Sequence, residues 1–132
     1  MITLIEWAAA VVLSIAGLSQ IYFGRLWLQY YEALLARGSS AVRGHGAMVG
    51  LCGAAIIIFH NMWSGPALVL TAFGWLLLAE GAFCLLAPDL SLRSLQRSEP
   101  ELRRTSIVVT GAGVLIVAGV LWVVLLPPLL AL

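Results

Sequence analysis

The sequence predicts an all-α integral membrane protein: a four-helix transmembrane bundle that runs up-down-up-down, with its N and C termini on the outer side. Composition is the first observation behind this prediction. Of the 132 residues, 62% are hydrophobic and 10% are charged, whereas about a quarter of the residues in a soluble domain are charged. Second, four apolar stretches each reach the roughly 20 residues that a helix needs to cross a bilayer. Third, the arginines gather in two of the connections between these stretches.

The four predicted spans cover most of the chain, so we expect a single transmembrane domain over residues 1–132. The spans comprise residues 2–22, 44–63, 66–87 and 106–126. Each run is apolar on every face and lacks the alternating pattern of a membrane-spanning β-strand. Helices are therefore expected in all four runs, and little of the chain is left outside the bilayer.

The basic residues predict the orientation of the bundle. All seven are arginines, and they lie in or at the edges of segments 25–43 and 88–105. Basic residues are enriched in the short cytoplasmic connections of membrane proteins. We therefore expect both arginine-rich segments in the cytoplasm and both termini outside.

Both cytoplasmic segments are expected to contain helical structure. In the first, Arg25, Gln29 and Glu32 recur at helical spacing and leave the opposite face apolar, which is typical of a helix lying in the membrane interface. In the second, Ser98 and Glu101 match a capping box. This motif predicts that Ser98 is the N-cap of the last helix.

Glu80 is the leading candidate for an intramembrane polar site, because an ionisable residue inside a bilayer is costly. It follows Pro66 by 14 residues, which places it roughly 21 Å from the outer end of its helix. Gln20 has a similar depth on the first span and is the expected hydrogen-bond partner. Two interpretations stay open: an acid on a proton or ion pathway, or a hydrogen-bonded group that joins two helices.

His60 and Asn61 complete the set of candidate polar residues. They precede Trp63 at the predicted outer surface, where the tryptophan is expected to anchor at the headgroups. Asn61 is expected to satisfy carbonyl groups freed at the helix end, and His60 is expected to form a hydrogen bond with another helix. Glu6, about one turn into the outer leaflet, is expected to reach water.

No metal ion or other cofactor is predicted. His45 and His60 lie 15 residues apart on one predicted helix, about 22 Å along its axis, so they cannot bind one metal ion or one haem iron together. A haem shared between subunits, through His60 or His45, is the remaining alternative. Cys52 and Cys84 are expected to be packing residues at different depths.

Small residues predict where helices approach closely. The second and fourth spans carry the glycines Gly46, Gly50, Gly53, Gly111 and Gly113. Helix association in lipid depends on close backbone approach and van der Waals contact, which small residues permit. Trp75 lies well inside the third span and is expected to make a packing or partner contact. These positions are candidates both for packing within the bundle and for contact with another protein.

The stretch from residue 60 to residue 88 carries a pattern of its own. It reads His60-Asn61-x-Trp63, then Gly74-Trp75 with Leu78 and Gly81, and then Pro88. This stretch resembles a family of small four-helix proteins of the bacterial inner membrane. The resemblance implies the same topology and a multi-pass location in that membrane, and it implies no activity. Members tend to carry a basic residue just before the second glycine, where this chain has Glu80.

The expected function is that of a non-enzymatic accessory or scaffold subunit of a larger respiratory, photosynthetic or transport complex in the membrane. No catalytic residues are predicted, because the sequence has no zinc-protease motif, phosphate loop or nucleophile beside a base. The alternative is a small oligomeric channel or a proton-coupled transporter that uses Glu80. Expected partners are the lipid bilayer and other membrane proteins or further copies of the chain. Nucleic acid is not expected, because the net charge is +1 and phosphate binding needs a clustered positive field.

Overall fold

The computed structural model describes residues 2–130, and in that range it contains six helices. They are α1 (Ile2–Tyr22), α2 (Gly24–Arg37), α3 (Ser39–Phe59), α4 (Leu68–Leu86), α5 (Pro88–Arg97) and α6 (Pro100–Leu130). Four of them, α1, α3, α4 and α6, are long and apolar enough to span a membrane. The prediction of an all-helical chain with four candidate spans is confirmed, and no strand occurs in the described range.

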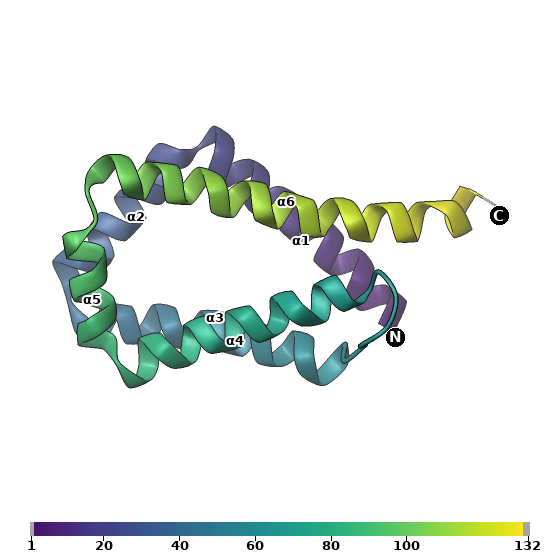
Figure 1. The fold of residues 1–132 in the computed structure, drawn as a ribbon, viewed down its shortest axis with the longest axis horizontal. Coiled ribbons are helices and arrows are strands. Elements are labelled where there is room, and N and C mark those ends of the chain that lie inside the picture. Colours follow the sequence, from purple (N-terminus) through teal and green to yellow (C-terminus); the bar gives the residue numbers. More distant parts are fainter. Residues whose placement is uncertain (1, 131–132) are drawn as a thin grey trace.

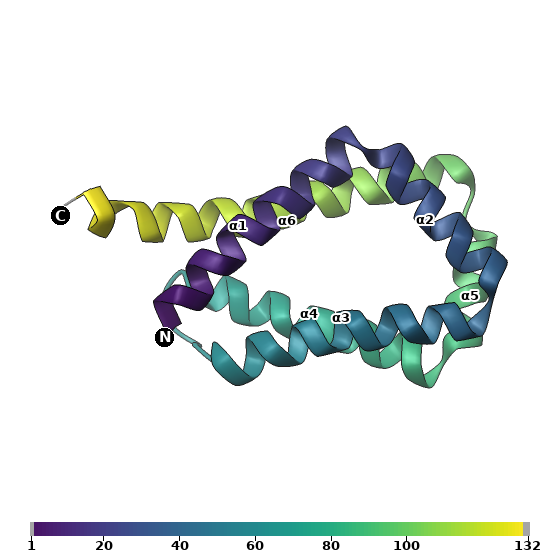
Figure 2. The same cartoon turned by 180° about the vertical axis from the view of Figure 1, so that it is seen from behind.

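The four long helices form two antiparallel pairs, α1 with α6 and α3 with α4 (Figure 1). The view from behind shows the same two layers, joined at one end by α2 and α5 (Figure 2). At the opposite end, Ala10 of α1, Leu70 of α4 and Leu121 and Leu125 of α6 form a small buried cluster. Contact between the two pairs is therefore concentrated toward the ends of the molecule.

The α3–α4 pair is held by glycines that let the two backbones touch. Gly46, Gly50 and Gly53 are buried on α3, and they face Gly74 and Gly81 of α4. A Cβ added to Gly53 would lie 2.5 Å from the backbone nitrogen of Leu78, which is closer than any real Cβ comes. The glycines of the second span thus pack within the chain, and close backbone approach is what brings these two helices together.

Glycines also allow close backbone approach at one place between α1 and α6. A Cβ on Gly111 would meet Gln20 and the carbonyl oxygen of Gly17, so α6 lies directly against α1 there. Gly113 and Trp75 take no comparable part in the packing. A Cβ added to Gly113 would lie in open space. The side chain of Trp75 on α4 is 47% exposed.

The helix boundaries refine the predicted spans. The first span matches α1, but α3 begins at Ser39 and ends at Phe59, so it starts and stops earlier than predicted. The last helix begins at Pro100, close to the predicted start. The predicted capping box is wrong, however, because the hydroxyl of Ser98 donates to the carbonyl of Leu95 at the end of α5, at 2.8 Å. Ser98 therefore closes α5 and does not cap α6.

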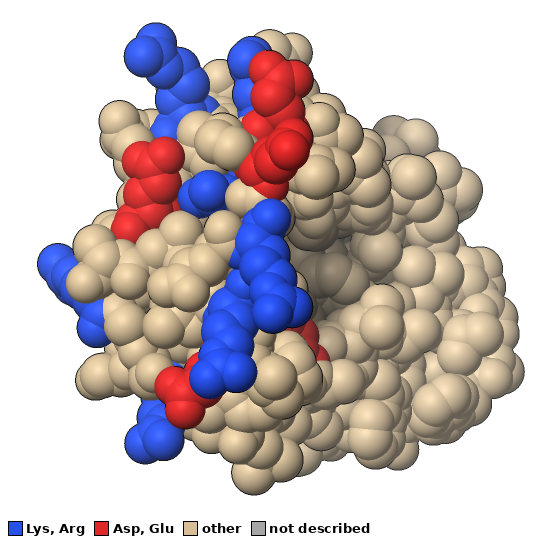
Figure 3. Space-filling view, turned by 60° about the vertical axis from the view of Figure 1, so that its left-hand side comes forward, with Lys and Arg blue, Asp and Glu red and all other residues tan. Residues whose placement is uncertain are grey.

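We call the end formed by α2, α5 and the adjoining ends of α3 and α6 the arginine end, because all seven arginines lie there. Figure 3 shows the basic and acidic side chains gathered on this end and the surface hollowed beside them. Gly38, with a positive φ of 76°, provides the sharp turn between α2 and α3. The hydroxyl of Ser39 donates to Asp89, which ties α3 to α5.

Candidate functional site

A cavity of about 420 Å³ lies between the two helix pairs, toward the arginine end. All six helices contribute to its lining. Its polar lining comes from two groups of side chains: Gln20, Tyr31, His45 and Glu80 form one, and Ser91, Ser94, Ser98, Arg103, Ser106 and Thr110 form the other. Ligand cavities in proteins commonly measure about 300–1,000 Å³. The arrangement therefore provides a mainly apolar cavity of ligand size, with a few polar side chains in its lining.

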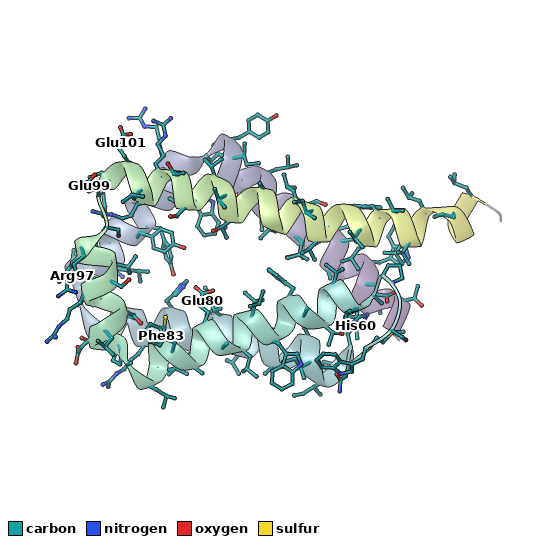
Figure 4. All side chains as sticks on the ribbon, in the orientation of Figure 1. His60, Glu80, Phe83, Arg97, Glu99 and Glu101 are labelled. Atoms are coloured by element: carbon teal, nitrogen blue, oxygen red, sulfur yellow. The ribbon has the colours of Figure 1, made fainter. Side chains whose placement is uncertain are left out.

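Glu80 projects from α4 into the space between the helix pairs (Figure 4). Its side chain is 55% exposed, and Oε1 lies 3.8 Å from Nε2 of His45 on α3. The nearby backbone contact of Gly46 with Gly81 sets this geometry, because it holds the two helices close beside the two polar residues. His45, which the sequence analysis did not connect with Glu80, is thus the titratable neighbour of this carboxyl group.

Gln20 was the predicted partner of Glu80, and it lines the same cavity. Among the described residues, however, its Oε1 is buried without any hydrogen-bond partner. The prediction brought the right residues to one place and assigned the wrong contact. A buried amide oxygen without a donor is costly, so Gln20 offers an unfilled acceptor at the cavity wall.

His45 connects Glu80 to the surface of the arginine end. Its Nδ1 lies 2.7 Å from the hydroxyl of Tyr30, and that tyrosine is exposed. The groups from the carboxyl of Glu80 through the imidazole to the phenol can each release and accept a proton. They lie along a short path from the cavity to the outside of α2, in which Tyr30 and His45 are hydrogen-bonded and Glu80 lies 3.8 Å from His45.

Tyr31 lies beside this path and remains a neutral hydroxyl at physiological pH. Burial raises the pKa of Tyr31 above its ordinary value of 10.0, and the charges of Glu80, Tyr30 and Cys84 raise it further. Burial also raises the pKa of Tyr30. Both phenols therefore act as hydrogen-bond donors at neutral pH, and neither adds negative charge to the carboxylate side of the cavity.

The wall of the cavity also carries hydroxyl groups from α5 and α6. Ser91 is 7% exposed, and its Oγ has no hydrogen-bond partner among the described residues. Arg103 also lines this wall, and its Nε donates to the carbonyl of Ser98 at 3.2 Å. The backbone at the start of α6 thus occupies part of the hydrogen-bonding capacity of this guanidinium.

A second polar cluster lies at the end of the molecule opposite to Glu80, around His60 (Figure 4). His60 is 0% exposed, and its Nε2 lies 2.9 Å from Oε1 of Glu6 on α1. Glu6 is 8% exposed, so the expectation that it reaches water is wrong. Its carboxyl group stays inside because the imidazole of His60 provides the hydrogen bond that water would otherwise make.

Thr71 joins His60 to the turn after α3. The hydroxyl of Thr71 donates to the carbonyl of His60 at 3.0 Å and accepts from the backbone N–H of Met62 at 3.1 Å. Nδ1 of His60 lies 3.3 Å from the same hydroxyl, so both ring nitrogens of His60 face a polar partner.

This second cluster is a structural connection between α1, α4 and the end of α3. A histidine between a carboxylate and a hydroxyl is also the arrangement of a hydrolase triad. Thr71 is fully buried, however, and its hydroxyl proton is directed to the carbonyl of His60. No substrate can reach that oxygen without opening the helix pairs, so a nucleophilic role is not supported.

Asn61 lies at the turn after α3 and does not line the cavity. It is exposed, and its Oδ1 accepts a hydrogen bond from the ring N–H of Trp63 at 2.6 Å. Gly65, with a φ of 69°, then reverses the chain into α4. The described contact of Asn61 thus fixes the indole of Trp63 and involves no helix-end carbonyl.

The two histidines belong to different clusters. Among residues 2–130, no group of three or more His, Cys, Asp or Glu side chains could hold a metal ion. Both ring nitrogens of His60 face hydrogen-bond partners, so His60 could ligate a haem iron only if this buried network were broken. His45 already has Tyr30 at its Nδ1.

Comparisons of the chain with protein-family models, with curated proteins and with solved structures find no match. The resemblance to small four-helix proteins of the bacterial inner membrane therefore stays a prediction. Function has to be inferred from the cavity itself: from its carboxyl group, its proton path and its unfilled hydrogen-bonding groups.

Proposed function

We propose that the protein is a small membrane carrier that moves a solute in exchange for protons, with Glu80 as the group that binds either one. The observation that carries this proposal is the position of Glu80, half exposed in a cavity to which all six helices contribute. Ionisable residues inside membrane helices commonly mark substrate or proton pathways. A carboxyl group used only to join helices would instead be closed off by hydrogen bonds.

Exchange follows from the chemistry of one carboxyl group in an apolar setting. A carboxylate that faces a largely apolar lining is stabilised when its charge is compensated, and either a bound proton or a bound cation can compensate it. Because either one neutralises the charge, the two compete for the same oxygen atoms. The imidazole of His45, 3.8 Å from Glu80, and the phenol of Tyr30 lie between this carboxyl group and the exposed face of α2.

The arrangement of the helices supports movement around this site. Within each pair, glycines bring the helices into backbone contact, so each pair can move as one body. Between the pairs, the buried cluster of Ala10, Leu70, Leu121 and Leu125 holds one end. Rocking of one pair against the other about that end would change access to the cavity, which is a common way for carriers to alternate between two sides.

The same proposal places the protein in a membrane, with the arginine end in the cytoplasm and both termini outside. What supports this orientation is that all seven arginines lie at the end formed by α2 and α5. The bacterial inner membrane is the proposed location. In that orientation, Tyr30 and the hollowed side of the cavity belong to the cytoplasmic half of the protein.

Proton flux into liposomes tests the proposed function. Purified protein is reconstituted with a pH-sensitive dye inside acid-loaded vesicles, and sodium, potassium or a small organic amine is added outside in turn. Exchange of the external cation for internal protons raises the internal pH, and vesicles without protein give the background. We expect a flux that falls at least tenfold in Glu80→Gln, because the amide cannot exchange a proton. Glu101→Gln is the matched control, since Glu101 is exposed at the start of α6 and does not line the cavity. Flux that is absent, or equal in wild type and Glu80→Gln, would contradict the proposal.

An accessory role in a larger complex is the second candidate. The observation that favours it is that Trp75 and Gly113 lie exposed and take little part in packing within the chain. Such positions suit contact with a neighbouring membrane protein. Purification in a mild detergent tests this candidate by asking which proteins remain bound. A retained partner that is lost in Trp75→Ala but kept in Leu76→Ala would support it, and a lone monomer would contradict it.

A further inference from the structure

We infer that the cavity binds a protonated organic amine with a small apolar body. Glu80 binds the ammonium group, which donates further hydrogen bonds to Gln20 and to the hydroxyl groups of the wall. This inference rests on the proposed function, which it deepens by naming the class of solute. It draws on the charge of the cavity, on its unfilled hydrogen-bonding groups and on its apolar lining.

The charge of the cavity favours a cation. Glu80 has no hydrogen bond from any described residue, and its nearest titratable neighbour, His45, lies 3.8 Å away, beyond ordinary hydrogen-bond distance. Its carboxylate therefore has capacity for a charged donor. Arg103, the one arginine in the lining, already donates Nε to a backbone carbonyl. A cationic group beside Glu80 would form a charge-assisted hydrogen bond with this carboxylate.

The unfilled polar atoms favour a ligand with several N–H donors. Oε1 of Gln20 accepts only, and Oγ of Ser91 can accept as well as donate; both are buried in the lining without a partner. A primary ammonium carries three N–H donors and no acceptor. Such a group can donate to several oxygen atoms at the same time. A carboxylate ligand could offer nothing to the oxygen of Gln20.

The remaining lining favours an organic body on that ammonium. The apolar side chains Leu34, Val42, Phe83, Leu95 and Ile107 line the same cavity of about 420 Å³. A small inorganic cation would leave this apolar volume unfilled, whereas an aromatic or branched alkyl group would bury its own surface there. The site thus combines one anionic end with an apolar wall, which is complementary to an amphipathic amine.

Calorimetric titration of the purified full chain in detergent tests the inference with three probes of one shape. Phenethylamine is the cation, 2-phenylethanol the neutral analogue and 3-phenylpropionate the anion, and each is also titrated into detergent alone. We expect saturable binding of the amine, with the alcohol and the carboxylate at least tenfold weaker. Equal binding of all three, tighter binding of the carboxylate, or no binding of the amine would overturn the inference.

Variants locate the binding group. Glu80→Gln should weaken phenethylamine at least tenfold, Gln20→Leu should weaken it several-fold, and Glu101→Gln should leave it unchanged. Glu80→Asp keeps the charge and should retain part of the affinity, which separates loss of the carboxylate from damage to the fold. If the amine binds Glu80→Gln as tightly as wild type, the assigned site is wrong.

The outcomes separate this inference from the proposed function. Proton flux that depends on Glu80, in a protein that does not bind phenethylamine, would overturn the amine assignment and leave the carrier proposal standing. Amine binding that depends on Glu80, without any proton flux, would support the amine assignment and overturn the carrier proposal. In that second case the chain is an amine-binding membrane protein and not a proton-coupled carrier.

Discussion

His60 and His45 show how the surroundings of a single residue decide its role. His60 is fully buried, with Glu6 at one ring nitrogen and Thr71 at the other. All of its hydrogen-bonding capacity is used inside the protein, so it connects helices. His45 has Tyr30 at one nitrogen, and its other nitrogen faces Glu80 across a gap too wide for a direct hydrogen bond. That open side leaves Nε2 of His45 available to a group bound in the cavity.

Removing the imidazole of His60 should destabilise the protein without affecting the cavity. The substitution His60→Ala leaves the carboxyl group of Glu6 buried without its partner, and we expect a loss of about 3 kcal/mol in the free energy of unfolding. Glu6→Gln should lose less, because the side-chain amide can still form a hydrogen bond with Nε2 of His60. Unfolding in mixed micelles measures both. Equal stability of His60→Ala and wild type would show that the pair contributes nothing.

The phenol of Tyr31 provides a pH-dependent readout of the carboxylate at Glu80. Its pKa is raised above 10.0 by burial and then by the charge of Glu80, so its stabilising contribution is complete below pH 10 and is lost as the pH rises through the raised value. In Glu80→Gln the burial remains and the charge is gone. We expect the tyrosinate absorbance to appear at lower pH in this variant than in wild type, and the difference to vanish in a Tyr31→Phe background. An unchanged titration would place the carboxylate far from Tyr31.

At the scale of helices, the sequence predicted the elements better than their ends. The first span, 2–22, coincides with α1 because a change of direction at Phe23 separates it from the amphipathic α2. The second span was predicted to run over residues 44–63, but the helix covers Ser39–Phe59. A run of apolar residues identifies the part of the chain that prefers lipid. The ends of the helix depend instead on turns such as the one at Gly38 and on tertiary contacts such as the hydrogen bonds of His60.

The glycine pattern predicted close packing without identifying the partner helix. Gly46, Gly50 and Gly53 were equally compatible with a contact inside the bundle and with a contact to another protein. The structure brings them against Gly74 and Gly81 of α4. Those two glycines are seven residues apart, two turns of one face, and this spacing was the available signal that α4 is the partner.

Adding a methyl group inside this interface should separate α3 from α4. In Gly53→Ala the new Cβ would lie 2.5 Å from the backbone nitrogen of Leu78, and overpacking of this kind costs about 1–3 kcal/mol. The control Gly113→Ala places the same group in open space, where alanine favours the helix by up to about 1 kcal/mol. Thermal unfolding of both variants measures the difference. Equal unfolding temperatures would contradict backbone contact between α3 and α4.

At the scale of the whole molecule, the site joins residues that lie far apart in the sequence. Glu80 and Gln20 were predicted from their depth in two spans, and they line one cavity. His45, Tyr30, Ser91 and Arg103 were not predicted. Three of these four lie on or at the edge of segments expected outside the bilayer, and composition alone does not show that α2 and α5 fold over one end of the helix pairs.

One signal could have connected His45 with Glu80. Both lie toward the arginine end of neighbouring antiparallel spans, so their depths are similar. Depth alone cannot decide whether two side chains face one another, because that depends on the rotation of each helix about its axis. The contacts among Gly46, Gly50 and Gly81 set this rotation, and these contacts exist only in the folded chain.

The two-pair arrangement makes the central claim specific: Glu80 exchanges its proton with water through the cavity at the arginine end. Infrared difference spectroscopy of the purified protein measures this most directly, by comparing wild type with Glu80→Gln in acidic and in alkaline buffer. The account predicts a carboxyl C=O band that is present in acid, absent in alkali, shifted in heavy water and missing from Glu80→Gln. A Glu80 carboxyl band that responds neither to the pH of the buffer nor to heavy water would contradict the account, because such a group is sealed from the cavity.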